Sequence, residues 1–276
     1  MKPPIDSLPL FPLLNERLIT LLKTLSAEDW LKQTVARQWM VKDVAAHLLD
    51  GNYRRIALHR DGWSAPPDAA IRSNADLVAY LNRLNADWIK AAKRLSPAIL
   101  TELLESTNET VYTLFNNLDP FAQSAYPVGW AGEDVSRNWF DIAREYTERW
   151  LHQQQIRDAL GDRGIMTKEL YHPFLHIFLQ AWPFACTALA AEEGTVLKTV
   201  ITGEGGGEWW LVRREGQWKL SEPSGGPVAA ETVISGDAAW KLFSKSLRKE
   251  DIAGHFGIKG DQVLGEAVLN MVSVMA

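Results

Sequence analysis

The chain has 276 residues, of which 46% are hydrophobic and 23% are charged, and its formal net charge is −5. These values are typical of a soluble globular protein with one large or two ordinary domains. The negative charge and the absence of a Lys/Arg-rich run argue against nucleic acid as the main partner. No apolar run reaches the length of a membrane span, so no membrane partner is expected.

Cysteine usage and the first residues indicate the compartment. The only cysteine, Cys186, lies in the apolar stretch QAWPFACTALAA, where we expect a buried small hydrophobe. One cysteine cannot form a disulfide within the chain, which fits a reducing compartment. The start MKPPIDSLPLFPLL lacks the cationic region and unbroken apolar core of a signal peptide. A cytoplasmic protein is therefore predicted.

The first two thirds of the chain are predicted to be helical. Apolar residues recur at three- and four-residue spacings. Ser26 and Asp29 form a cap pattern for a short helix through Trp30, while Ser73 and Ser136 are placed to begin two long helices. Apart from the short helix through Trp30, the predicted helices cover residues 8–25, 40–60, 73–96, 111–118 and 136–161. Four main helices of this length predict a bundle.

The pattern changes near Gly194, where short β-branched and aromatic runs are separated by glycines. These runs predict antiparallel strands followed by helices, and thus a small α+β part. The strands cover residues 195–203, 207–216, 217–223 and 229–237, and helices are predicted over 167–192, 238–247 and 262–275. The predicted fold class is mainly α, with domain 1–165 forming a four-helix bundle and domain 166–276 holding one helix and the α+β part.

Glu148 and His152 are four residues apart on one predicted helix, so their side chains face the same way. His47 lies in an apolar stretch of another helix. Together they offer a His/His/carboxylate ligand set that leaves one position open, as in catalytic metal sites. Zinc, nickel, iron and manganese all suit these ligands. Asp43 is placed to orient His47 as an outer partner. In the alternative without a metal, Asp43 satisfies His47 in the bundle core, and Glu148 and His152 form an ordinary surface pair.

Other histidines are assigned structural roles. His172 and His176 are also four residues apart, but a proline between them indicates a helix start, where capping or packing is favoured over metal binding. His59 is rotated about 120° from the His47 face and is excluded from the site. The pair Asp251 and His255 lies in a polar, glycine-flanked stretch that predicts a solvated turn.

Three blocks resemble the DinB-like, mycothiol-dependent maleylpyruvate isomerase superfamily. WMVKDVAAHLLDGNYRR is similar to its first-histidine helix and REYTERWLHQQQIRDALG to its Glu-x-x-x-His helix, while the tail from residue 233 is similar to its sterol-carrier-like α+β domain. The resemblance implies a four-helix bundle with a divalent metal, commonly zinc. By position, the implied ligands are His47, Glu148 and His152. The family uses low-molecular-weight thiols for isomerase or S-transferase chemistry.

One departure concerns Gln155, where related sequences often have an aspartate. This position is not a ligand, so the departure bears on thiol or substrate recognition. No motif indicates which residues would hold a thiol cofactor. Arg144 and Arg149 lie about one turn or less from Glu148 and either face a substrate carboxylate or form solvated surface charges.

The leading prediction is therefore thiol-dependent isomerisation or S-transfer on a small electrophilic substrate through a metal-activated thiolate. The first alternative is a metal-dependent hydrolase, for which Asp43 and Asp50 are the candidate general bases. The second is a non-catalytic module that binds an apolar ligand among the tryptophans. The loop with Tyr126 and Trp130 is either a mobile lid or an ordinary connection. The oligomeric state is left open.

Overall fold

A computed structural model describes residues 2–223 and 226–273 of the chain. The described residues group into two compact units. The first unit holds residues 2–122 and 148–165, and the second holds residues 123–147 and 166–273. This grouping reflects contacts and not independent folding, so the division into domains 1–165 and 166–276 stays a prediction.

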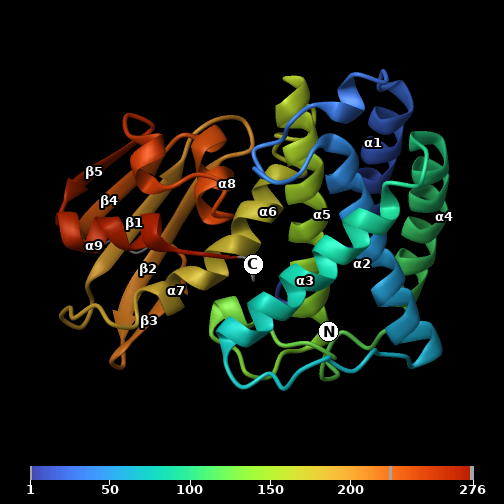
Figure 1. The fold of residues 1–276 in the computed structure, drawn as a ribbon. Helices are drawn as coiled ribbons and strands as arrows, with labels where there is room; N and C mark the ends of the chain where they lie inside the picture. The colour runs from blue at the N-terminus through green and yellow to red at the C-terminus, as the bar shows by residue number, and fades with distance from the viewer. Residues whose placement is uncertain (1, 224–225, 274–276) are drawn as a thin grey trace. The chain divides into compact units, whose positions relative to one another are not determined.

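The first unit is a helical bundle (Figure 1). Helices α2 and α4 pack along each other, α1 packs against α4, and α3 packs against α2. Leu22, Val44, Leu49 and Leu104 are among the buried residues of its hydrophobic core. Its helices are α1 (Phe11–Thr24), α2 (Val41–Asp61), α3 (Asn74–Ala92), α4 (Pro97–Asn116) and the part of α5 (Asn138–Leu160) from Glu148 onward. The predicted bundle is confirmed.

Helix starts follow local capping chemistry. Ser73 caps α3 by accepting a hydrogen bond from the Asp76 N–H, as predicted. Helix α4 is longer than the predicted segment 111–118, so that prediction is wrong in extent. Ser96 accepts a hydrogen bond from the Ile99 N–H, and Pro97 follows it in the first turn. Proline lacks an amide that would need a partner there, so this Ser-Pro pair begins a helix.

The predicted cap of α5 is wrong. The Ser136 hydroxyl accepts a hydrogen bond from the Val128 N–H at 2.8 Å and donates one to Glu133. Both bonds tie the preceding loop together. Helix α5 begins at Asn138, two residues beyond Ser136.

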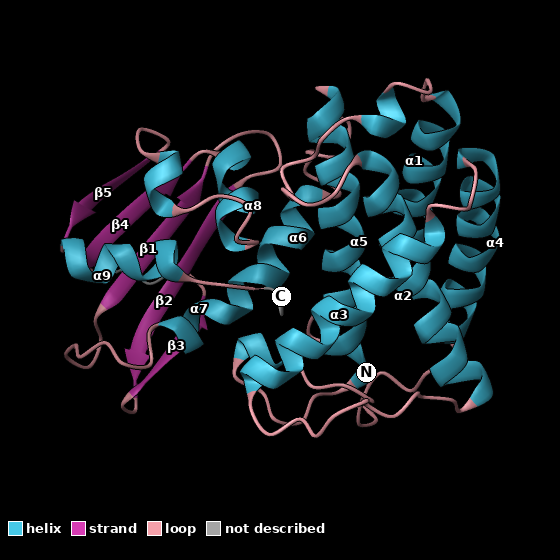
Figure 2. Cartoon of the chain, viewed as in Figure 1, coloured by secondary structure: helices cyan, strands magenta, loops and turns pink. Residues whose placement is uncertain are grey.

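The second unit contains a mixed sheet with strand order β3-β2-β1-β4-β5 (Figure 2). The pairs β1–β2, β2–β3 and β4–β5 are antiparallel, whereas β1–β4 is parallel, so the prediction of antiparallel strands holds for only three of the four pairs. The strands are β1 (Val196–Ile201), β2 (Gly207–Arg214), β3 (Gln217–Ser221), β4 (Val228–Ile234) and β5 (Phe256–Gly260). Strand β5 was not predicted. It follows directly on the turn expected around Asp251 and His255. The α+β prediction is confirmed.

The helices of the second unit are shorter than predicted. The single helix expected over 167–192 is instead α6 (Tyr171–Phe178), a 3-10 turn and α7 (Trp182–Ala185). Pro183 lies in the first turn of α7, where its ring opposes continuation of the preceding helix. Helix α8 (Gly236–Phe243) overlaps the helix predicted over 238–247 but begins two residues earlier and ends four residues earlier. The predicted 262–275 helix is shortened to α9 (Gln262–Glu266) and a 3-10 turn, and positions 274 and 275 lie outside the described residues.

The burial of Cys186 and the character of the helices can be compared with the sequence predictions. Cys186 is buried, and this burial raises the pKa of its thiol to about 12, as expected for a structural cysteine. Within residues 2–223 and 226–273, no helix combines the length and the apolar character needed to cross a bilayer.

Candidate metal centre

Helices α2 and α5 bring together the three side chains predicted as metal ligands. His47, Glu148 and His152 each offer one ligand atom, and these atoms lie within 4.8 Å of one another. His152 Nε2 is 3.4 Å from Glu148 Oε2. Two ligand atoms that bind a tetrahedral cation at about 2.1 Å stand about 3.4 Å apart. The spacing of this pair therefore suits a divalent cation without rearrangement of α5.

The two ring nitrogens of His152 have different surroundings. Nδ1 lies 2.9 Å from Gln155 Oε1, one turn further along α5. An amide oxygen only accepts hydrogen bonds, so with this orientation of the Gln155 amide the contact is a hydrogen bond when Nδ1 carries a proton. The lone pair of Nε2 then faces the Glu148 carboxylate. Two electron-rich atoms in contact repel each other unless a proton or a cation lies between them. This arrangement fits a bound cation.

His47 is held differently. Its Nδ1 is buried and has no hydrogen-bond partner among the described residues. The ring centroid lies 4.6 Å from that of His152 and 4.7 Å from that of Trp39, so packing fixes the ring. Burial lowers the pKa of His47 well below its ordinary value, and the charges of His152 and Arg54 lower it further. A neutral imidazole with an unused nitrogen is the form that binds metals.

Trp39 forms an aromatic wall beside both histidines. Its ring centroid is also 6.0 Å from that of His152. The Trp39 carbonyl accepts hydrogen bonds from Gln33 Nε2 at 2.9 Å, from Thr34 Oγ1 at 2.7 Å and from the Thr34 N–H at 3.2 Å. These bonds hold the segment before α2 in one conformation. The indole is thereby kept against the candidate ligands.

The acidic residues of α2 are engaged elsewhere. Asp43 Oδ2 accepts a hydrogen bond from the Met40 N–H at 3.0 Å, which closes the first turn of α2. The structure thus gives Asp43 a capping role in place of the predicted role beside His47. Asp50 lies 3.1 Å from Arg54 Nε. Burial raises the pKa of Asp50, and the positive charge of Arg54 opposes that shift.

Arg149 is buried within the first unit. Its guanidinium donates hydrogen bonds to the side-chain oxygens of three asparagines, Asn15, Asn52 and Asn108. It also lies over the Phe11 ring, 5.5 Å from the centroid. Arg149 is therefore neither a solvated surface charge nor a free group for a substrate. Its contacts join α1, α2, α4 and α5.

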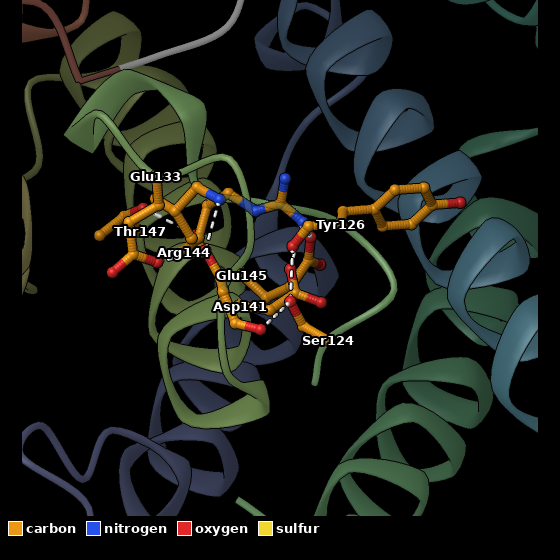
Figure 3. A network of polar contacts seen from close by, with 9 residues as sticks. Ser124, Tyr126, Glu133, Asp141, Arg144, Glu145 and Thr147 are labelled. Atoms are coloured by element: carbon orange, nitrogen blue, oxygen red, sulfur yellow. Dashed lines mark hydrogen bonds and ion pairs between the residues drawn. The ribbon is translucent and has the colours of Figure 1, made fainter. Parts of the chain in front are cut away.

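Arg144 belongs to a polar network in the second unit (Figure 3). It donates a hydrogen bond to Asp141, and its Nη2 lies 3.8 Å from Glu145 Oε1. The guanidinium lies 5.9 Å from the centroid of the Tyr126 ring. Carboxylates already balance its charge, so the contacts of Arg144 are those of a structural ion pair.

The loop before α5 is anchored by packing. Trp130 is buried, with ring centroids 5.9 Å from Phe140 and 6.1 Å from Phe178. Gly132 has φ +83°, and a Cβ at this position would lie 2.7 Å from the Phe184 ring. The described contacts are those of an ordinary connection and give no support for a lid.

Sequence reasoning missed two side chains that shape this site. Gln155 was noted only as a departure from related sequences, and Trp39 only as part of a resembling block. The three-residue spacing from His152 to Gln155 was a usable signal, because such pairs meet on a helix surface. The contact of Trp39 with the histidines depends on the fold of residues 32–40 and had no local signal.

The fold and the ligand geometry define a class, that of helical-bundle proteins with a candidate two-histidine, one-carboxylate metal site. The family described as the mycothiol maleylpyruvate isomerase N-terminal domain matches residues 11–157, which is more than half of the chain. The chain belongs to this family. No curated protein matches it.

Two solved structures with TM-scores above 0.5 support the fold. A crystal structure of the mycothiol-dependent maleylpyruvate isomerase aligns with a TM-score of 0.54 and 12% identity, over 87% of this chain and 88% of that chain. A mutant of the same enzyme aligns with a TM-score of 0.53, the same identity and the same coverage. Sterol Carrier Protein 2 from Yarrowia lipolytica aligns over 50% of this chain and 91% of that chain, at 14% identity and a TM-score of 0.24.

Proposed function

We propose that this protein is a divalent-metal-dependent enzyme that uses a low-molecular-weight thiol to isomerise a small electrophilic substrate, or that joins the thiol to such a substrate as an S-transferase. The observation that carries the proposal is the convergence of His47, Glu148 and His152 on one point. Membership of the mycothiol maleylpyruvate isomerase N-terminal domain family indicates which chemistry such a centre serves. Zinc is the expected metal, and nickel, iron and manganese suit the same ligands.

Three protein ligands leave room for an exogenous one, which favours catalysis over a structural role. A divalent cation held here would lower the pKa of a thiol that joins it, so that the thiolate forms near neutral pH. The thiolate sulfur would add to an unsaturated carbon of the substrate, and the electron pair of the double bond would move to the neighbouring carbon. Rotation followed by loss of the thiolate gives isomerisation, whereas protonation of that carbon gives the transferase product.

The chain's own residues contribute orientation and shielding to this chemistry. Gln155 orients His152, and the Trp39 indole covers one side of the two imidazoles. Neither Arg144 nor Arg149 supports recognition of a substrate carboxylate, because both guanidinium groups are already engaged. The single cysteine favours a cytoplasmic location, where small thiols stay reduced.

The alternatives have less support. Hydrolysis needs a general base, yet Asp43 caps α2 and Asp50 pairs with Arg54. A module that only binds an apolar ligand would explain the approach of His152 Nε2 to the Glu148 carboxylate as a structural pair on α5, but it would not explain why His47 of α2 lies beside that pair. No observation favours either alternative over thiol chemistry.

Metal quantification on protein purified without a histidine tag tests the proposal first. We expect close to one divalent cation per chain, and stabilisation when metal and then a small thiol are added, because ligands that bind only the native state raise Tm. Product analysis with unsaturated dicarboxylates, with and without thiol, follows. Less than about a tenth of a metal per chain even after reconstitution would refute the proposal. Turnover that is independent of thiol would favour hydrolysis.

A further inference from the structure

We infer that Gln155 is a positioning residue that selects which nitrogen of His152 meets the metal. The inference rests on the proposed metal site and deepens it. By accepting a hydrogen bond from Nδ1–H, the amide oxygen of Gln155 fixes one tautomer of His152. Nε2 is then left as the ligand atom and faces the same space as the Glu148 carboxylate.

The contact is well isolated from water. Gln155 Oε1 lies 2.9 Å from His152 Nδ1, and the two residues are only 5% and 8% exposed. Solvent therefore cannot easily replace the amide as the partner of Nδ1. Both residues lie on α5, within one helical turn, so the rigid backbone sets their separation.

The role follows from the chemistry of a neutral imidazole, which carries one N–H and one lone pair. With the proton on Nδ1, the Nε2 lone pair lies 3.4 Å from Glu148 Oε2 and can be shared with a cation. If the amide were turned, its NH₂ group would donate to Nδ1, and the proton on Nε2 would bond to Glu148. That second arrangement would make the contact purely structural. The two arrangements predict opposite tautomers.

Gln155 also sets the charge of the site. A carboxylate at this position would accept the same hydrogen bond, add a negative charge and strengthen imidazole as a ligand. A neutral amide orients the ring without that charge. The centre therefore retains more positive charge, which favours binding of an anionic thiolate at the open position.

The first test reads the tautomer of His152 in metal-free protein. Long-range ¹H–¹⁵N spectra of the neutral imidazole, assigned with the His152→Ala variant, distinguish Nδ1–H from Nε2–H. We expect Nδ1–H in the parent protein and loss of this preference in Gln155→Leu. An Nε2–H tautomer in the parent would overturn the inference.

The second test measures zinc affinity by competition with a chromophoric chelator. We expect Gln155→Leu to bind zinc about 10–100-fold more weakly, the usual cost of losing an outer partner of a metal-bound histidine. Gln155→Glu should restore parental affinity or exceed it, because it keeps the acceptor and adds charge. Circular dichroism checks that each variant retains its helices.

Gln154→Leu is the matched control. Gln154 is the neighbouring glutamine on α5, is 1% exposed, and its side-chain oxygen has no hydrogen-bond partner in the described part of the chain. Its replacement should leave zinc affinity unchanged. Equal affinity in the parent and Gln155→Leu would refute the role of Gln155 alone. A parent that binds neither zinc nor another divalent cation would refute the proposed function itself.

Discussion

Each unit contains a pair of potential ligands four residues apart on the same helix. In the first unit, α5 carries Glu148 and His152, and a third candidate, His47, arrives from α2. In the second unit, α6 carries His172 and His176. Equal spacing places each pair on a common helix face, yet only the first pair belongs to a group of three among the described residues.

The Nδ1 atoms of the second pair are engaged in polar contacts within the second unit. His172 Nδ1 lies 3.0 Å from Lys168 Nζ and 3.0 Å from the Gly206 carbonyl oxygen. His176 Nδ1 accepts a hydrogen bond from Trp209 Nε1 at 3.2 Å, and the Trp209 ring stacks on His172 with centroids 5.2 Å apart. A cationic lysine beside an imidazole disfavours a metal ion. A four-residue spacing thus places two side chains on one helix face, and the neighbouring residues determine whether they can bind a metal together.

The largest expected effect separates the two pairs directly. His152→Ala should weaken metal binding by about 100-fold or more, because a lost ligand costs more than a lost outer partner. The helices should remain largely formed. His176→Ala is the control at the equivalent position of the other pair and should bind metal like the parent. Metal content after dialysis and chelator competition provide the measurement, and equal metal content in His152→Ala and the parent would contradict the assignment.

A smaller effect is expected for Glu148→Gln. The amide retains an oxygen in nearly the same place but loses the negative charge, so it is a poorer ligand for a divalent cation. We expect a loss of about 10-fold in affinity, between those of the parent and His152→Ala. The same titration measures it. A loss as large as that of His152→Ala would mean that the charge of Glu148, and not its position, dominates binding.

The smallest effect concerns stability in the second unit. Burial is the main cause that lowers the pKa of His172 and of His176; Lys168 also lowers the pKa of His172, while Glu222 opposes the shift of His176. Because these pKa values are lower in the folded state, the unfolded chain binds more protons below about pH 6.5. The folded state therefore loses stability as the pH falls through that value.

Thermal unfolding of metal-free protein between about pH 8 and pH 5.5 measures this loss. Replacing both histidines by glutamine should make the acid-induced fall in Tm smaller, because glutamine takes up no proton in this range. Each kcal/mol of regained stability would raise Tm by about 2–4 °C in a domain of this size. A control with His255→Gln, which alters an exposed histidine of the same unit, should follow the parent curve. Identical curves for the double variant and the parent would show that the two imidazoles are not coupled to folding.

The predictable features of this chain were the local ones. The cap formed by Ser73, the glycine-bounded run of aromatic and β-branched residues in β2, and the common face of Glu148 and His152 depend on residues a few positions apart. His47 was added to the pair because it lies in an apolar stretch of another predicted helix, and the family resemblance implied the same ligand. The approach of α2 to α5 itself is a property of the bundle. Asp43 was expected beside His47, whereas its carboxylate accepts a hydrogen bond from the N–H of Met40, which is nearer in the sequence.

Features set by tertiary contacts escaped prediction. Arg149 was expected at the surface or facing a substrate, yet its asparagine partners come from three other helices. Strand β5 is defined by pairing with β4, and its own sequence, FGIKG, carries little strand signal. In both cases the contacting residues are far apart in the sequence, so the spacing of apolar residues along the chain does not indicate that they meet.

The position of Trp39 gives the candidate centre an optical reporter of its own. Twelve tryptophans share the emission of this chain, but the Trp39 indole lies against both histidines of the centre, with ring centroids 4.7 Å and 6.0 Å away. Transition ions with partly filled d shells quench a nearby excited indole, and quenching falls off steeply with distance. Binding of cobalt or nickel would therefore quench the fluorescence of Trp39 far more than that of an average tryptophan. Occupancy of the metal site could then be followed by intrinsic fluorescence without a label.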